Sequence, residues 1–280
     1  MNKEKKMPWW RRLHQKLVYA FHDSKFGHFW SKWHLQYLLL TGVMYGVKAG
    51  LYFFVAYIPS NPISFGYVSG NILTQESIHY SMAIDEAIPL VSYFYFFYLL
   101  YYIVPEIFLW ILSFFDKKKM VTIVIAAITS TIIAVICFAS QQVKMLRPED
   151  ELAYYDSFSK VDSLDALFKY GIHWQYGADE TALNCIPSLH ANVGMALAMV
   201  GIWTGKDEKH FPIGLRIFCS IFGFGIIMST FFVKQHYFVD AITGAALFVI
   251  MYFLYKLLIV PHYLKRKALK EEKSQKLLEA

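Results

Sequence analysis

The hydrophobic positions along this chain gather in long runs, and the charged and polar residues collect between those runs. A helix needs ~20 predominantly apolar residues to cross a bilayer. Six segments meet or approach this requirement: residues 35–58, 88–115, 121–139, 186–204, 211–233 and 237–260. The pattern therefore predicts an all-α, polytopic membrane protein with six transmembrane helices.

Two of these segments carry features that simple lipid-facing helices lack. Pro105 interrupts the second segment, where it predicts a kink or a re-entrant break. The fourth segment is the most polar, because it contains Ser188, His190 and Asn192. Ionisable groups are costly inside a membrane, so this segment is also a candidate for function.

The composition indicates lipid as the main solvent of the chain. Of the 280 residues, 56% are hydrophobic and 17% are charged, whereas soluble domains are roughly 25% charged. This balance excludes a disordered chain and is atypical of a soluble domain. The three cysteines form no even framework and no Cys-x-x-Cys pair, so neither a disulfide scaffold nor a zinc–cysteine site is indicated.

The distribution of basic residues predicts the side of the membrane on which each segment lies. Nineteen Lys and Arg residues fall in the N-terminal segment, at residues 117–119 and 206–209, and after residue 260, whereas five fall in the opposite set of loops. By the positive-inside rule, both termini are predicted to be cytoplasmic and residues 141–185 to form an external loop. Most of the basic residues then face the anionic inner leaflet. The net charge of +6 therefore does not indicate a nucleic-acid partner.

The predicted organisation has three parts. Residues 1–34 interleave Trp with Lys and Arg, which is typical of an interfacial segment, although a disordered basic tail has a similar charge. Residues 35–261 form the six-helix catalytic domain in the membrane, and residues 262–280 form a basic cytoplasmic tail. We expect the protein in the cell membrane, with its active site on the external side.

Two histidines are predicted to meet at the external ends of the helices. His190 follows Pro187 and Ser188 at the start of the fourth segment. A serine there can serve the unpaired N–H groups of a helix, and an anion can bind to them. His236 and Asp240 are four residues apart at the start of the sixth segment, so the carboxylate can fix the tautomer of the imidazole.

Two basic residues, Arg147 and Lys144, begin the external loop at the same predicted depth. Taken singly, the residues at this depth have structural explanations: a packed core histidine, a helical ion pair or an interface anchor. Their joint occurrence on one side of the membrane is hard to explain by scaffolding, and it favours a catalytic site.

These residues resemble the motifs of a known family of integral membrane enzymes. Pro187-Ser188-Leu189-His190 resembles the Pro-Ser-x-His motif of the type-2 phosphatidic acid phosphatase superfamily. His236 and Asp240, with Ser229 at the matching distance, resemble its Ser-Arg-x5-His-x3-Asp motif, and Arg147-Pro148 resembles the end of its Lys-x6-Arg-Pro motif.

Two positions depart from the family motifs. Ser140 stands where the first motif has Lys, and Thr230 stands where the last motif has Arg. The strings around the two histidines are closer to the branch that contains inositol phosphorylceramide synthases and the related sphingomyelin synthases. The departures leave open which groups replace the missing phosphate-binding cations. The resemblance to this branch makes head-group transfer a stronger candidate.

The resemblance implies a two-step phosphoryl transfer from a lipid phosphate substrate. His236, oriented by Asp240, attacks phosphorus and forms a phosphohistidine, and His190 protonates the leaving alcohol and then activates water or an acceptor hydroxyl. The expected phosphate-binding residues are Arg147, Ser188, Lys234 and Lys144. No metal ion and no other cofactor is expected, because cationic side chains take the charge of the phosphoryl oxygens.

The favoured hypothesis is a lipid phosphate phosphatase that acts at the outer face of the membrane. The alternative is a lipid head-group phosphotransferase, which has to shield its intermediate from water and hold an acceptor hydroxyl. A metal-binding transporter with His190, His236 and Asp240 as ligands and a non-catalytic membrane scaffold are remoter alternatives. Apart from the substrate, the expected partners are membrane lipids, and the sequence indicates neither the oligomeric state nor the lipid.

The external loop has two further properties. Its aromatic residues suit a lid or an acceptor pocket, although a position at the lipid interface explains them equally well; they are Tyr154, Tyr155, Phe158, Phe168, Tyr170, Trp174 and Tyr176. Between residues 149 and 180 the loop also holds eight Asp or Glu residues against two Lys. The sequence offers no physical reason for an acidic segment above an anion-binding site.

Overall fold

The computed structural model describes residues 25–32, 34–57, 83–140, 147–178, 186–202, 211–259 and 261. Within these ranges the chain consists of helices and turns without a β-strand, which confirms the predicted all-α class. Most of residues 1–34 and all of the tail after residue 261 lie outside the described residues, apart from α2 (Lys25–Lys32) and His34.

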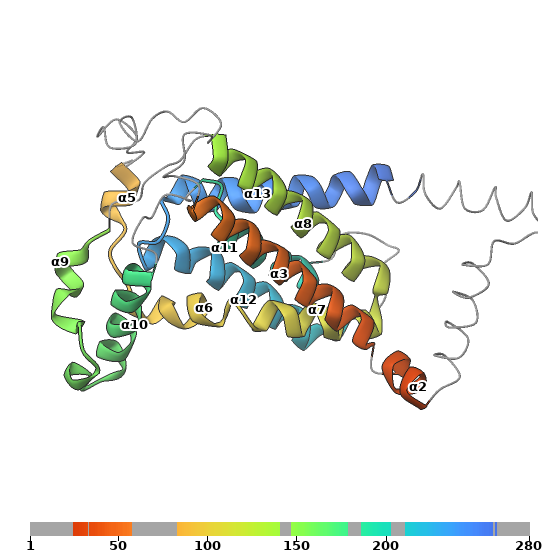
Figure 1. Cartoon of the computed structure of the whole chain (residues 1–280), viewed down its shortest axis with the longest axis horizontal. Helices are drawn as coiled ribbons and strands as arrows, with labels where there is room; N and C mark the ends of the chain where they lie inside the picture. Colours follow the sequence, from red (N-terminus) through yellow and green to blue (C-terminus); the bar gives the residue numbers. More distant parts are fainter. Residues whose placement is uncertain are drawn as a thin grey trace, which may run out of the picture.

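The longer helices run alongside one another as a bundle (Figure 1). They are α3 (Leu35–Tyr57), α7 (Val104–Phe115), α8 (Lys117–Ser140), α11 (Leu189–Gly201), α12 (Ile213–Phe232) and α13 (Phe238–Leu254), and α13 continues as a π-helical turn at Tyr255–Ile259. Three other helices lie at one end of this bundle, at the left of Figure 1: α5 (Ala83–Ala87), α9 (Glu149–Leu152) and α10 (Leu164–Ala178). The helix α2 lies at the opposite end.

Three helices are long and apolar enough to cross a membrane: Lys117–Phe138, Ile213–Phe232 and Phe238–Leu258. The segments Ser92–Leu100 and Val104–Phe115 form a fourth candidate, with a bend of 47° between them. Pro105 lies in the first turn of α7, directly after this break, where its missing N–H needs no partner. An interruption of this segment is therefore present next to the predicted proline, and both a kinked span and a re-entrant break fit it.

The remaining two predicted spans correspond to shorter apolar stretches, Leu35–Met44 and Leu189–Gly201. The described residues thus contain three to four candidate spans, and the count of six remains a prediction. The helix α11 has 13 residues, which at ~1.5 Å per residue is shorter than the hydrocarbon core of a bilayer. Nearly all of its side chains are buried by neighbouring helices, which explains how this segment tolerates its polar residues.

The helices α11 and α12 cross in close contact because glycines line their interface. A Cβ atom at Gly223 would lie 2.4 Å from the carbonyl oxygen of Gly194 and 2.5 Å from the main-chain nitrogen of Ala198. Small residues of this kind let helix backbones approach one another inside a membrane. The crossing fixes α11, and with it the end of α11 that carries His190, against α12.

The far end of α11 is held by two cationic side chains. The ammonium of Lys119 donates to the carbonyl oxygen of Ile202 at 2.7 Å, and Nε of Arg216 donates to that of Gly201 at 2.9 Å. Positive charge at a helix C-terminus satisfies the last carbonyl groups and complements the helix dipole. The central helix is therefore anchored at the end opposite the candidate site.

Candidate active site

The N-terminus of α11 lies directly against α13. Ser188 caps α11, since its hydroxyl oxygen accepts from the main-chain N–H of Ala191 at 3.2 Å, as the sequence predicts. Its own N–H donates to the carbonyl oxygen of Asp240 at 3.0 Å. Gly244 permits this contact, because a Cβ atom there would lie 2.2 Å from the carbonyl oxygen of Ser188.

A tight turn between α12 and α13 carries the second histidine. Lys234 adopts a left-handed conformation with φ of 54°, which is uncommon for a residue with a side chain. The N–H groups of Gln235 and His236 both donate to the carbonyl oxygen of Thr230, at 2.9 and 3.0 Å. The chain is reversed here, and His236 is fixed two residues before α13 begins.

Asp240 supports His236 from the first turn of α13. Its Oδ2 atom accepts from the main-chain N–H of Tyr237 at 3.0 Å and lies 3.7 Å from Nδ1 of His236. The predicted pairing is present, but His236 makes it from the turn and not from one face of a helix. Asp240 is completely buried, so the carboxylate faces the imidazole without competition from solvent.

The two histidines are in direct contact. Nε2 of His236 lies 3.4 Å from Nδ1 of His190, and the ring centroids are 5.5 Å apart. A proton on Nδ1 of His236 would face Asp240 across 3.7 Å, and the tautomer that carries it there has a lone pair on Nε2. The ring of His190 also stacks on Tyr98 at 4.6 Å and contacts Tyr101 at 4.4 Å between centroids, which fixes its plane.

Arg147 is tied to the same turn. Its Nη2 atom donates to Oε1 of Gln235 at 2.8 Å, and its guanidinium lies 4.9 Å from the ring centroid of Tyr176 in α10. The hydroxyl of Tyr176 donates to the carbonyl oxygen of Val233 at 2.8 Å. Burial raises the pKa of Tyr176, so this phenol stays protonated and keeps its donor.

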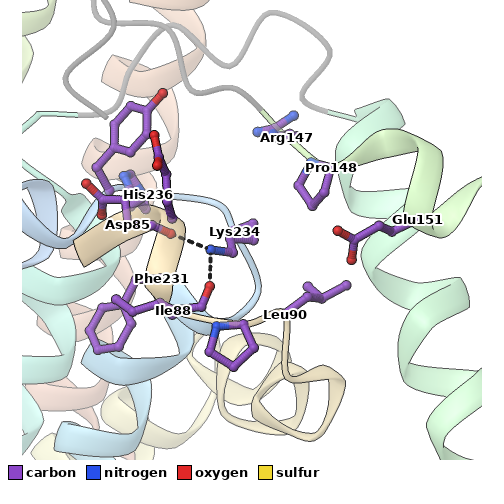
Figure 2. Close-up of a pocket in the computed structure, with 12 residues that line it drawn as sticks. Asp85, Ile88, Leu90, Arg147, Pro148, Glu151, Phe231, Lys234 and His236 are labelled. Carbon is purple, nitrogen blue, oxygen red and sulfur yellow. Dashed lines mark hydrogen bonds between the residues drawn. The ribbon is translucent and has the colours of Figure 1, made fainter. Parts of the chain in front are cut away.

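Lys234 connects the turn to α5. Its ammonium donates to the carbonyl oxygen of Asp85 at 2.8 Å and to that of Ile88 (Figure 2). Oδ1 of Asp85 accepts from the N–H of Phe238 at 2.7 Å. Burial lowers the pKa of Lys234, and the nearby carboxylates of Asp85 and Glu151 oppose that shift. Since an ammonium has three N–H groups, these two bonds leave one that can face the pocket.

A pocket of about 440 Å³ adjoins His236. Figure 2 shows Arg147 and Glu151 on one side of it and Asp85 and His236 on the other, with Lys234 between them. Its charged lining consists of two cations, Arg147 and Lys234, and three carboxylates, Asp85, Glu86 and Glu151. Within the described residues, no group of three or more His, Cys, Asp and Glu side chains is arranged to hold a metal ion.

The match of the chain to the model of a known protein family identifies the family to which it belongs. The model of the PAP2 superfamily matches residues 73–254, which is more than half of the chain and includes both histidines, Asp240 and Arg147. The chain belongs to the PAP2 superfamily. Neither a curated protein nor a solved structure matches it. Membership supports an activity of the phosphatase or phosphotransferase type, as the sequence motifs predict.

The structure also accounts for one departure from the PAP2 motifs. Thr230, which stands where the motif has Arg, is completely buried, and its hydroxyl donates to the carbonyl oxygen of Ile227 at 2.7 Å. This side chain is therefore bonded within its own helix and does not reach the histidines. Lys144 lies outside the described residues, so its predicted role at the phosphate stays a prediction.

Three residues at the site are not singled out by the motifs. Asp85 comes from the segment before the second predicted span, and Gln235 directly precedes His236. Tyr176 is one of many aromatic residues in the loop predicted to be external. Asp85 and Tyr176 act on the turn through contacts between segments far apart in sequence, which no local pattern reveals. For Gln235, its position next to His236 is the one signal available from the sequence.

Proposed function

We propose that this protein is an integral-membrane lipid phosphate phosphatase that forms a phosphohistidine on His236. One observation carries the proposal: Nε2 of His236 faces Nδ1 of His190 at 3.4 Å, with Asp240 behind His236. A nucleophile, a proton carrier and an orienting carboxylate are thus aligned in one row. His236 lines a pocket together with Arg147, whose guanidinium is a group that binds phosphate.

In the first step, the lone pair on Nε2 of His236 attacks phosphorus, and the bond from phosphorus to the lipid alcohol breaks. His190 donates a proton to the departing oxygen. In the second step, His190 takes a proton from water, the resulting hydroxide attacks phosphorus, and the bond to His236 breaks. Inorganic phosphate leaves, and both imidazoles return to their initial states.

The two imidazoles are hydrogen-bonded to each other at the place where this reaction needs the phosphoryl group. An in-line displacement places phosphorus between the nucleophile and the leaving oxygen, so the phosphoryl group has to lie between His236 and His190. Binding of substrate therefore exchanges this hydrogen bond for contacts with the phosphoryl group. The cations Arg147, Lys234 and Lys144 then balance its charge, and Ser188 is the fourth predicted ligand of the phosphoryl group.

The proposal includes a location for the site. The excess of basic residues in one set of loops supports six spans with both termini in the cytoplasm. Under that topology the residues of the site face the outside of the cell membrane, at the depth of lipid head groups. A tag inserted near Asp162 is then accessible from outside intact cells, and tags at either terminus are protected; a reversed pattern places the site in the cytoplasm.

Head-group transfer is the second candidate, and the charge of the pocket favours it. Three carboxylates stand beside two cations, and they oppose binding of a doubly charged phosphate monoester more than binding of a singly charged diester. The external segment is also packed in place by Tyr176 and Ile172, which are buried against Tyr95 and Tyr98. A segment fixed in this way beside Arg147 suits the exclusion of water that transfer needs.

One experiment separates these outcomes. Purified protein is incubated in vesicles of mixed phospholipids that contain phosphatidic acid, and free phosphate and new lipid species are followed by mass spectrometry, with the His236→Ala variant as the blank. Release of phosphate supports the phosphatase, and a new phospholipid supports transfer. If wild-type and variant proteins give the same lipids, the proposed function is wrong.

A further inference from the structure

We propose that the side-chain amide of Gln235 binds the phosphoryl group of the substrate, as a neutral donor in place of a cation that the family motif places near this site. The inference rests on the proposed function and adds a substrate-binding residue to it. Two motif positions that are basic in the family are Ser140 and Thr230 in this chain. The site therefore needs other donors for the phosphoryl oxygens.

The geometry of the amide identifies the atom concerned. Oε1 of Gln235 accepts from Nη2 of Arg147 at 2.8 Å, and a guanidinium has donors but no acceptor. The oxygen must therefore be the atom that faces Arg147, and Nε2 is left to serve another group. Gln235 is 4% exposed, and its Nε2 atom is buried without a hydrogen-bond partner among the described residues.

A buried donor without a partner is rare, because it loses its hydrogen bonds to water and gains none. Such a group at a functional site indicates a ligand that satisfies it. The neighbours of this amide define the ligand: the guanidinium of Arg147 on one side and His236 as the next residue along the chain. A phosphoryl group that binds Arg147 and accepts attack from His236 brings an oxygen to the same place.

The amide is also held in a fixed position. The main-chain N–H groups of Gln235 and His236 share the carbonyl oxygen of Thr230, so the two side chains leave one rigid turn. Fixed donors that need no rearrangement during the reaction stabilise transition-state charge most effectively. Gln235 thus has the rigidity, burial and unused donor that a phosphate ligand requires.

The decisive variant is Gln235→Glu. Glutamate keeps an oxygen acceptor for Arg147 but replaces the donor with a negative charge. If the amide binds the phosphoryl group, kcat/KM falls by about 100-fold or more, the loss typical of a removed transition-state donor, and inhibition by inorganic phosphate weakens in parallel. If both quantities stay at the wild-type values, the amide does not contact the phosphoryl group, and the proposal is overturned. A loss that comes only from the added negative charge is separated from the loss of the donor by the Gln235→Lys variant.

Two further variants complete the experiment. Gln175→Glu adds the same charge in α10, outside the turn that carries Gln235 and His236, and it is expected to change kcat/KM by less than about twofold. Gln235→Lys removes the acceptor for Arg147 but supplies a donor. It strengthens inhibition by inorganic phosphate if this position contacts phosphate, and it weakens that inhibition if the position only holds Arg147.

The binding of inorganic phosphate to the purified protein is measured separately from turnover. A wild-type protein that binds phosphate but converts no lipid contradicts the proposed function, while the comparison of Gln235→Glu with wild type still tests the amide. Equal phosphate affinity in these two proteins contradicts the role of Gln235, whatever the lipid assays give. The two proposals therefore fail on different measurements.

Discussion

Nε2 of His236 lies 3.4 Å from Nδ1 of His190, although 46 positions separate the two residues along the chain. The contact joins the turn before α13 to the first turn of α11. Asp240 and Ser188 link the same two elements through a main-chain hydrogen bond of 3.0 Å. The relative placement of the two imidazoles is therefore built into the packing of α11 against α13.

The role of His190 as a proton donor predicts a dependence on the leaving group. A His190→Ala variant is expected to lose about 100-fold or more in kcat with an alkyl phosphate, since the alkoxide then leaves without a proton. With p-nitrophenyl phosphate, whose phenolate needs little protonation, formation of the phosphoenzyme is expected to stay near the wild-type rate. Single-turnover kinetics with both substrates measure this difference, and equal losses on both would contradict the assignment.

In the proposed mechanism, Asp240 orients His236 and does not react with the substrate itself. An Asp240→Asn variant is expected to lose about 10²- to 10⁴-fold in kcat but to retain more activity than His236→Ala, because the nucleophile is still present. The amide oxygen of the variant can still accept from the N–H of Tyr237, so the thermal unfolding temperature should change little. A variant as inactive as His236→Ala shows instead that the carboxylate takes part directly in the chemistry.

Gly244 is predicted to be essential for the distance between the histidines. In a Gly244→Ala variant the new methyl group meets the carbonyl oxygen of Ser188, so α13 has to move away from α11. We expect a loss of about 1–3 kcal/mol in the free energy of unfolding and a lower kcat. Gly214→Ala, where no atom lies within 4 Å of the added Cβ, is the matched control and should match wild type in kcat.

Lys234 has two separable properties, a strained backbone and an ammonium that holds α5. Lys234→Gly relieves the left-handed conformation, so it is expected to be more stable than Lys234→Ala by about 1 kcal/mol. Both variants lose the bonds to the carbonyl groups of Asp85 and Ile88, and both also lose a predicted phosphate ligand. KM should therefore rise in both, because α5 forms one wall of the pocket and because the ammonium is absent. Thermal unfolding and steady-state kinetics measure the two effects, and a KM that stays at the wild-type value in both variants contradicts the second.

The sequence predicts the helical class, the interruption at Pro105 and the capping of α11 by Ser188, because each depends on residues close together in the chain. It also predicts that Asp240 pairs with His236, since four residues separate them. The sequence pattern places both residues on one face of a helix, whereas His236 lies in the turn before α13. The left-handed Lys234 ends α12 at this turn, and no local signal such as glycine marks the position.

Other features depend on packing between distant segments and have no local signature. The carboxylate of Asp85 reaches the N-terminus of α13 across 153 positions, and the hydroxyl of Tyr176 reaches Val233 across 57. The acidic character of residues 149–180, in the loop predicted to be external, has a partial explanation in the structure. Asp156 and Asp165 form ion pairs with Lys160 and Lys169 at 2.8 and 2.7 Å, and Glu151 lines the pocket.

The central claim is a covalent phosphohistidine at His236, and its direct detection is the sharpest test. Wild-type protein is mixed with a phosphate-labelled lipid substrate, quenched at alkaline pH to preserve the acid-labile N–P bond, digested and mapped by mass spectrometry. The account predicts one labelled peptide, with the phosphoryl group on His236, and no label in the His236→Ala variant. Label on another residue, or turnover by the His236→Ala variant at the wild-type rate, would contradict it.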